Sequence, residues 1–481
     1  LKDPLHEFEI NFLLNLDEWA DFVSPDGLQE MNGKIKADLK FRGRIDDIEN
    51  IQQREFENSR VQIALHCDNI MIKPKNSIPA IEKLSGKIHV INDRIKLDSC
   101  NFKILEHQIS TEGIIENLIA FTLFENNHKD TKFDLITSIP ELDMERLLTH
   151  LEESSDHDSI AHHDIPKNLM LNSHFNIRSF KYREFSATDL RGNLHYASSQ
   201  LALPAFSLHS MNGNIKGNAH IKILQNGYTA VGNIISEKVN IKQLFESFEN
   251  FDQDYLRKEH LNGHLSNDAD ISLRFDKKGE IIPESIVFES SLEIVNGELV
   301  NFDPMKNLSK FIALSELEHI TFSKLENTIF IKDQLITIPQ MDIHSSAFNI
   351  SFSGTHSFDN EIDYHLKVLL SDLLANKAGN EKNKNREFFV YEPEDQGKTS
   401  LFLKITGTVD DYKIKYDTKK VKEKIKTDLK QEKTELKEVL NEEFGWFKKD
   451  ADVIKKKEAK KMKTKEQPFI IEWEEDTLYN H

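Results

Sequence analysis

The densest group of side chains able to bind a metal lies in residues 156–164. This stretch reads Asp-His-Asp-Ser-Ile-Ala-His-His-Asp, so the candidate ligands are His157, His162, His163, Asp156, Asp158 and Asp164. A zinc site needs ligands that further hydrogen bonds hold in place, and this stretch has neither a cysteine nor helical His-x-x-x-His spacing. Its polar composition is typical of a loop. We therefore expect no functional metal site and no cofactor.

Motifs for nucleophilic, nucleotide-binding and zinc-dependent catalysis are missing from the sequence. It contains no Gly-x-Ser-x-Gly, no Gly-x-x-x-x-Gly-Lys-Ser/Thr, no Gly-x-Gly-x-x-Gly and no His-Glu-x-x-His. The carboxylate pairs Glu152–Glu153 and Glu442–Glu443 lie in runs of charged residues, which are typical of a solvated surface. The glycines are expected at strand starts or ends, where they serve turns. We expect a protein that is not an enzyme.

The two cysteines, Cys67 and Cys100, fall in different predicted strands and form no Cys-x-x-Cys pair. Two cysteines alone cannot make a four-ligand metal site. The interpretation we favour is two buried thiols, and a single disulfide is the alternative.

The composition indicates a β-rich globular chain with an acidic body and a basic tail. The 481 residues are 38% apolar and include 31 Phe against 3 Trp, with no apolar run long enough to span a membrane. The net charge is -19, yet residues 419–465 hold 17 Lys against 10 acidic residues. An acidic body argues against nucleic acid as a partner, because phosphate binding needs clustered Lys and Arg on a folded face.

A short pattern occurs three times and predicts three short amphipathic helices. Residues 14–20, 142–148 and 239–245 each read apolar, Asp or Asn, apolar, two polar residues, then two apolar or small ones. The Asp or Asn suits the N-cap of a helix. In the third copy, Phe248 and Phe251 extend the apolar helical face.

Between these segments the apolar period changes to two, as in residues 35–41 and 61–67, which predicts strands with one apolar face. One repeated unit begins at Gly86 and again at Gly192, and in both copies nine residues separate the glycine from Ile95 or Leu201. The interval after Leu97 is two residues longer than its counterpart after Leu203, as a turn insertion would make it. A third strand group follows from Ile329 onward.

Short strands joined by tight polar turns predict one long antiparallel sheet. Few helices are available to cover it, so either the sheet folds over on itself or part of its apolar face meets a ligand. Long acyl chains would suit such a face. The residues expected to line it are Ile88, Val90, Ile95, Leu97, Phe102, Ile104, Leu194, Tyr196, Leu201, Leu203, Phe206, Leu208, Ile329, Ile331, Ile338, Met341, Ile343, Ile350, Phe352, Ile362, Tyr364, Leu366 and Val368.

The repeats divide the chain into modules. Residues 1–151 form a first module, 152–256 a second, 257–418 a third β region, and 419–481 a Lys/Glu-rich helical and flexible tail. Residues 152–166 and 376–398 are polar and are expected to be mobile loops. Residues 303–317 are expected to add one more helix.

From about residue 292 to 446 the sequence resembles the C-terminal region of the AsmA-like family of bacterial envelope proteins. The segments that carry the resemblance are 303–311, 325–329, 338–341, 345–347, 353–356, 362–364 and 442–445. Relatives in this family include TamB and YhdP. The resemblance implies a mainly β fold, an elongated β-taco or U-shaped sheet with an apolar inner wall, a few short helices and a charged C-terminal helix.

The same resemblance implies a periplasmic protein that an N-terminal helix, upstream of Leu1, anchors in the inner membrane. The expected function is passive, bridge-like transport of phospholipid between the inner and outer membranes, with acyl chains, both membranes and other envelope proteins as partners. The first alternative is a structural scaffold or assembly factor for outer-membrane proteins whose sheet is fully self-covered. The second is an enzyme acting on envelope glycans.

Overall fold

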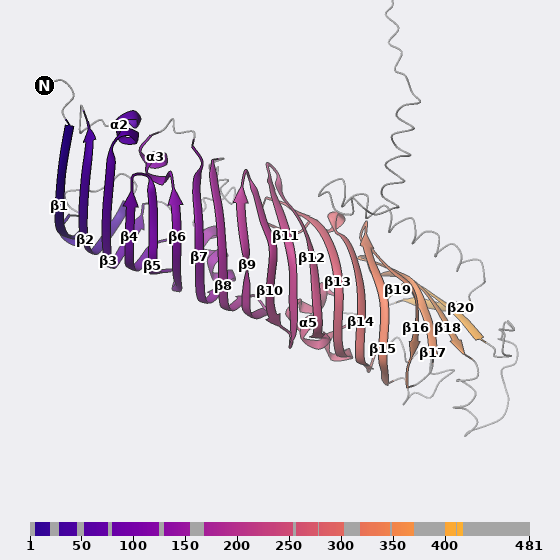
Figure 1. The fold of residues 1–481 in the computed structure, drawn as a ribbon. Helices are drawn as coiled ribbons and strands as arrows, with labels where there is room; N and C mark the ends of the chain where they lie inside the picture. The colour runs from indigo at the N-terminus through magenta and orange to yellow at the C-terminus, as the bar shows by residue number, and fades with distance from the viewer. Residues whose placement is uncertain are drawn as a thin grey trace, which may run out of the picture. The chain divides into compact units, whose positions relative to one another are not determined.

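The structure is a computed structural model of the chain, and Figure 1 shows its fold. It describes residues 5–19, 28–45, 52–75, 79–124, 129–153, 168–253, 256–277, 279–302, 318–346, 349–369, 400–409 and 411–416. All described strands belong to the unit Leu1–Tyr416, which is separate from Asp417–His481. The expected helix at 303–317, the loop at 376–398 and the tail therefore lie outside the described residues.

Among the described residues, twenty strands form a single open sheet and the helices are few and short, so the fold is mainly β as expected. The strands are β1 (Leu5–Asn15), β2 (Leu28–Arg44), β3 (Arg60–Pro74), β4 (Ile81–Ile91), β5 (Arg94–Ile104), β6 (His107–Glu116), β7 (Thr131–Asp143), β8 (Leu169–Tyr182), β9 (Phe185–Ala197), β10 (Gln200–Ser210), β11 (Gly213–Leu224), β12 (Gly227–Asn240), β13 (Leu261–Phe275), β14 (Val287–Val300), β15 (His319–Lys332), β16 (Leu335–His344), β17 (Asn349–Ser357), β18 (Glu361–Leu369), β19 (Ser400–Thr408) and β20 (Tyr412–Tyr416). The helices are α1 (Leu16–Trp19), α2 (Gln53–Asn58), α3 (Leu118–Leu123), α4 (Met144–Glu153) and α5 (Ile241–Ser247), with short 3-10 turns η1 (Glu249–Asp252), η2 (Lys258–His260) and η3 (Pro283–Ser285).

Each strand pairs with the next one in the chain, and every pair but one is antiparallel. The exception is β7 with β8, which run parallel. The link between them, residues 144–168, is long enough for the crossover that a parallel pair requires, and it contains α4. The expected antiparallel sheet is therefore correct apart from this one step.

A row of bulges bends the strands partway along their length. The register shifts between Asn32 and Lys34 in β2 and between Cys67 and Ile70 in β3, and similar shifts occur in β5, β12 and β16. Asn69 (φ 52°) and Lys238 (φ 55°) adopt left-handed backbone at two of these bulges. Because a bulge increases local bend and twist, a row of them curls a sheet, as a U-shaped sheet requires.

Serine hydroxyls compensate for the backbone groups that the bulges remove from the ladder. Ser85 Oγ accepts a hydrogen bond from the Asn69 backbone N–H at 3.0 Å, and Ser266 Oγ accepts one from the Lys238 backbone N–H at 3.1 Å. Both bonds lie at exposed positions, where each replaces a ladder bond that the bulge removes.

The three repeated segments form helices, as predicted, and all three lie at the same edge of the sheet. Strands β1, β7 and β12 run in the same direction because an even number of antiparallel steps separates them. Each strand ends at its repeated motif, where α1, α4 or α5 begins. We call this the lower edge, as Figure 1 shows for α5, whereas α2 and α3 lie at the upper edge. At α5, Asn240 caps the helix by accepting a hydrogen bond from the Gln243 backbone N–H at 2.9 Å.

Two local predictions were wrong. Gly86, Gly113, Gly192 and Gly217 lie inside strands rather than at their ends. The intervals after Leu97 and Leu203 are also not turns, because each is a bulge within one continuous strand. A period-two pattern cannot distinguish a bulge from a turn, since both interrupt the alternation by a residue or two.

The helical face expected beyond Ser247 also differs in the structure. Helix α5 ends at that residue, and Glu249, Asn250 and Phe251 then adopt positive φ angles of 50° to 58°. Left-handed residues cannot continue a right-handed helix, so Phe248 and Phe251 are placed by a turn.

Candidate functional site: the apolar sheet face

Residues that pair across neighbouring strands share a face of a sheet, so the register traces one face along the whole sheet. Ile88 pairs with Leu97, which pairs with Gly113. The same row continues through Leu135, Ser173 and Leu194. The first and second repeat units therefore present their apolar residues on the same side.

The trace continues to the last strands. Tyr196 pairs with Leu201, and further rows connect Ile271 to Phe288 and Phe288 to Ile331. Ile331 pairs with Ile336, which shares its face with Ile338. The remaining pairs on this face are Met341 with Phe352, Ile343 with Ile350, Phe352 with Leu366, Gly354 with Tyr364, and Ile350 with Val368. All residues that the sequence analysis assigned to an apolar face lie on one face, which we call the apolar face; for Val368 only the backbone position is described.

The apolar face is shielded but not covered. No second sheet packs on it within the described ranges, because all twenty strands belong to one sheet. Most of its side chains are half-buried, and a few are buried, among them Val90 (6% exposed), Tyr196 (7%) and Leu366 (6%). Others remain open to solvent, among them Phe8 (42%) and Ile234 (37%). Large apolar side chains in one layer shield one another in this way when the layer curls toward them.

Strands β1 to β3 add apolar-face residues that the sequence analysis left out of its list. Phe8 pairs with Phe41, and Leu39 pairs with Ile63. The Phe8 and Phe41 rings stack with centroids 5.1 Å apart. The period-two alternation in residues 35–41 and 61–67 was the signal, so the face could have been extended to β2 and β3 from sequence alone.

Aromatic rings lie over glycines on this face. A Cβ atom built on Gly192 would come within 2.8 Å of the Phe175 ring, and one on Gly354 would come within 2.7 Å of the Tyr364 ring. Gly217 stands in the same relation to Phe206, at 3.0 Å. The lack of a side chain lets each ring lie close to the neighbouring strand, which keeps the face smooth.

Two groups of polar side chains on the apolar face bond to one another or to the backbone. Thr111 Oγ1 donates to the Ile136 carbonyl at 3.2 Å and lies 3.3 Å from Thr137 Oγ1. In a second group, Ser236 bonds to Asn267, whose Nδ2 donates to Ser290 Oγ at 3.4 Å. These side chains therefore form hydrogen bonds with one another within the sheet, and they interrupt the apolar face only locally.

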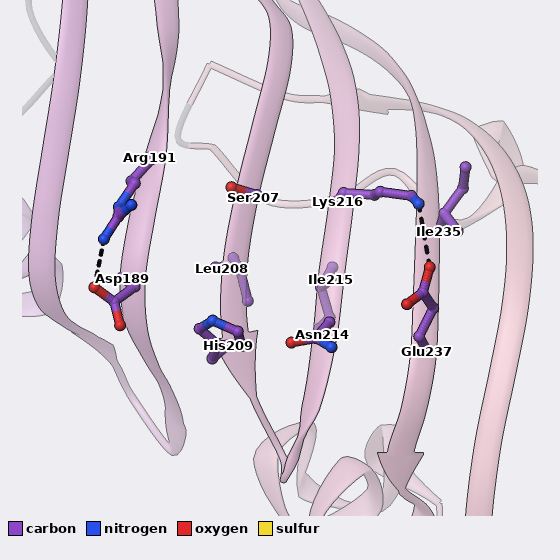
Figure 2. Close-up of a pocket in the computed structure, with 10 residues that line it drawn as sticks. All are labelled: Asp189, Arg191, Ser207, Leu208, His209, Asn214, Ile215, Lys216, Ile235 and Glu237. Carbon is purple, nitrogen blue, oxygen red and sulfur yellow. Dashed lines mark hydrogen bonds and ion pairs between the residues drawn. The ribbon is translucent and has the colours of Figure 1, made fainter.

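The opposite face is polar and carries the hollow drawn in Figure 2. This cavity of about 340 Å³ lies between β9 and β12. Its charged side chains are paired, since Arg191 lies 3.0 Å from Asp189 and Lys216 lies 3.1 Å from Glu237. Leu208 and Ile215 belong to the apolar face of the same strands.

One titratable cluster lies where β17 meets β18. His356 Nδ1 is 2.8 Å from the Tyr364 hydroxyl and Nε2 is 3.4 Å from Asn360 Oδ1. Burial lowers the pKa of His356 and raises the pKa of Tyr364. These contacts connect the ring of His356 in β17 to Tyr364 in β18.

The remaining candidate groups are the two cysteines, the possible metal ligands and the two carboxylate pairs. Cys67 and Cys100 are free and buried, and burial raises the pKa of both thiols, so the preference for two thiols is confirmed. Within the parts of the chain that are described, no group of three or more His, Cys, Asp or Glu residues could hold a metal ion. The candidate ligands at 156–164 and the pair Glu442–Glu443 lie outside the described residues, and Glu152–Glu153 ends α4.

None of the helices among the described residues is long and apolar enough to cross a membrane. Comparisons of the chain with protein-family models, with curated proteins and with solved structures each found no match.

Proposed function

We propose that this protein binds the acyl chains of phospholipids along its apolar face and conducts them between the inner and outer membranes of a bacterial envelope, without catalysis. The observation that carries the proposal is the continuity of the apolar face, which the strand register extends from β1 to β20. In a self-contained domain, a second layer of strands or helices would cover an apolar face that extends over twenty strands. Here one layer of strands leaves it partly accessible.

The physical basis of binding is burial of apolar surface, which contributes about 25 cal/mol per Å². A hydrocarbon chain lying on the face would exclude water from Ile, Leu, Val and Phe side chains on every strand. Because similar residues recur from strand to strand, the binding free energy changes little with position. A chain can then move along the face without meeting a deep minimum, so the same surface can bind and conduct.

The charged positions of the opposite face suit contact with lipid headgroups and solvent. Strand positions that alternate with the apolar ones carry charge, as in Lys36, Asp38, Lys40 and Arg42 of β2, all of them exposed. The resemblance of residues 292–446 to the AsmA-like region supports a periplasmic location and attachment to the inner membrane.

The decisive experiment measures lipid on protein purified without detergent. Organic extraction and mass spectrometry of the purified chain should recover phospholipid, and the protein should transfer labelled phospholipid between donor and acceptor vesicles. Protein that carries no lipid and accelerates no transfer would contradict the proposal and favour a scaffold whose sheet is self-covered.

A further inference from the structure

Five phenylalanines form a contiguous cluster at the lower edge of the sheet, which we call the rim cluster. Its members are Phe180 of β8, Phe185 of β9, Phe245 of α5, Phe248 and Phe251. Ring centroids lie 6.2 Å apart for Phe180–Phe185, 6.0 Å for Phe185–Phe248, 5.6 Å for Phe248–Phe251 and 5.2 Å for Phe245–Phe251. These separations are those of rings in contact. The cluster is therefore an unbroken path of hydrocarbon.

One end of this path joins the apolar face. Phe180 pairs with Ala187, which is 4% exposed. Ala187 lies beside Ser210, because His209 pairs with Thr188 one step earlier, and Ser210 Oγ donates to the Ser186 carbonyl. Ser210 follows Leu208 by two residues and so shares its face. The cluster thus begins on the apolar face itself.

The other end of the path is open to solvent. Phe248 is 46% exposed and Phe251 is 53% exposed, and the two rings stack with planes only 10° apart. Exposed phenyl rings in contact form a patch that water hydrates poorly. Such a patch on a protein surface marks a place where apolar material binds.

The backbone that presents these rings is strained and firmly held. Glu249, Asn250 and Phe251 are three consecutive non-glycine residues in the left-handed region, a conformation that is unfavourable for Glu249 and Phe251 and that Asn tolerates better. Asn250 Oδ1 accepts a hydrogen bond from the Lys258 backbone N–H at 2.9 Å, and the Lys258 ammonium lies 2.9 Å from Glu246. Strain that surrounding contacts maintain is typical of functional sites. Its effect here is to place Phe251 on Phe248, outside the sheet.

We propose that the rim cluster is a lateral portal, where the acyl chain of a membrane phospholipid crosses the lower edge on its way to the apolar face. The inference rests on the proposed function and adds a place of entry. Phenyl rings offer no hydrogen bonds, so the occupant they fit is hydrocarbon. A chain crossing elsewhere along this edge would meet polar turn residues such as Asn212, Ser345 and Ser346, whereas the cluster provides an apolar route.

The test compares rates of loading. The double variant Phe248→Ser/Phe251→Ser removes the two exposed rings, and Leu123→Ser/Ile136→Ser removes two apolar side chains of similar exposure (62% and 54%) outside the cluster. Each full-length protein is mixed with phosphatidylethanolamine/phosphatidylglycerol vesicles that contain pyrene-labelled phosphatidylethanolamine. We expect the rim variant to load about tenfold more slowly, equivalent to about 1.4 kcal/mol at the crossing step, with an unchanged final amount of lipid. The control should load at the wild-type rate.

The outcomes separate the portal from the function on which it rests. If the wild type takes up no lipid, the proposed function fails and the portal fails with it. If the wild type loads and the rim variant loads equally fast, the portal is refuted while the lipid-binding face stands. Should the rim variant fold poorly, Phe251→Trp provides a second measurement. Brominated acyl chains should quench the fluorescence of the new indole during loading, and the absence of added quenching relative to the wild type would overturn the proposal.

Discussion

A charge placed on the apolar face should reduce lipid binding without unfolding at an exposed position, and should unfold the protein at a buried one. Ile234 is 37% exposed and pairs with the small residues Gly217 and Ala269. Leu366 is 6% exposed and pairs with Phe352 and Leu403. The sequence placed Leu366 among the residues expected to line the lipid-binding face. The structure instead makes Leu366 the buried control.

The expected magnitudes follow from burial. Leu366→Asp loses about 1.5–3 kcal/mol of apolar burial. It also adds about 2–7 kcal/mol for a polar group without a hydrogen-bonding partner. Their total approaches or exceeds the stability of a marginal domain, about 5 kcal/mol. In Ile234→Asp the carboxylate keeps most of its water, so only the partial burial of the isoleucine is lost, about 1–2 kcal/mol.

Two measurements on each variant test this reasoning. Circular dichroism should show a folded Ile234→Asp with a slightly lower melting temperature, and a Leu366→Asp that is unfolded or melts far below the wild type. Extraction and mass spectrometry should find clearly less phospholipid on Ile234→Asp than on the wild type. Ile136→Asp, at an exposed position on the opposite face, should keep both stability and lipid. A folded Ile234→Asp that carries the wild-type amount of lipid would refute the assignment of this face to acyl chains.

Three further predictions follow from single features of the chain. Deleting residues 419–465, with their 17 Lys, should weaken the binding of the protein to anionic vesicles at low salt and much less at high salt. Each Lys near an anionic surface contributes about 1 kcal/mol before salt screening. If the deletion variant binds as well as the wild type at low salt, this charge has no role in membrane binding. Cys67 and Cys100 should react with a thiol reagent at pH 8 only after unfolding, and fast reaction of the native protein would contradict their burial. Burial holds the pKa of His356 in the folded protein below 6.5. As the pH falls, the His356 side chain is therefore protonated in the unfolded chain before it is protonated in the folded one. The folded state should lose part of its stability below pH 6.5 for this reason. Thermal unfolding between pH 7.5 and 5 should show this loss in the wild type, and His356→Gln should reduce its slope.

Much of the fold could be predicted from local patterns. The period-two alternation at Ile35–Phe41 and Val61–Cys67 predicted strands with one apolar face, and the structure has β2 and β3 there. The Asp or Asn before each short helix predicted α1, α4 and α5, because capping depends on a few adjacent residues. The sequence also indicated that helices were too few to cover the sheet, which is a matter of composition and spacing.

Other features depended on contacts between residues distant in the chain. The parallel step between β7 and β8, the bulges after Leu97 and Leu203, and the placement of Gly192 beneath the Phe175 ring depend on which strand lies alongside which. Alternation is the same for a parallel and an antiparallel neighbour, and a bulge shows only when its partner strand is known.

The exposure of each side chain on the apolar face also depends on which strands lie alongside it. Ile234 and Leu366 are both apolar residues within strands, and nothing in their types distinguishes an accessible position from a covered one. They differ in the structure because Gly217 and Ala269 leave Ile234 open, whereas Phe352 and Leu403 cover Leu366. The sequence alone was enough to assign the predicted lining residues to the apolar side, because the side-chain period of a strand is two. Only the tertiary structure decided which of them remain accessible, because burial depends on the size of the side chains that pairing places on either side.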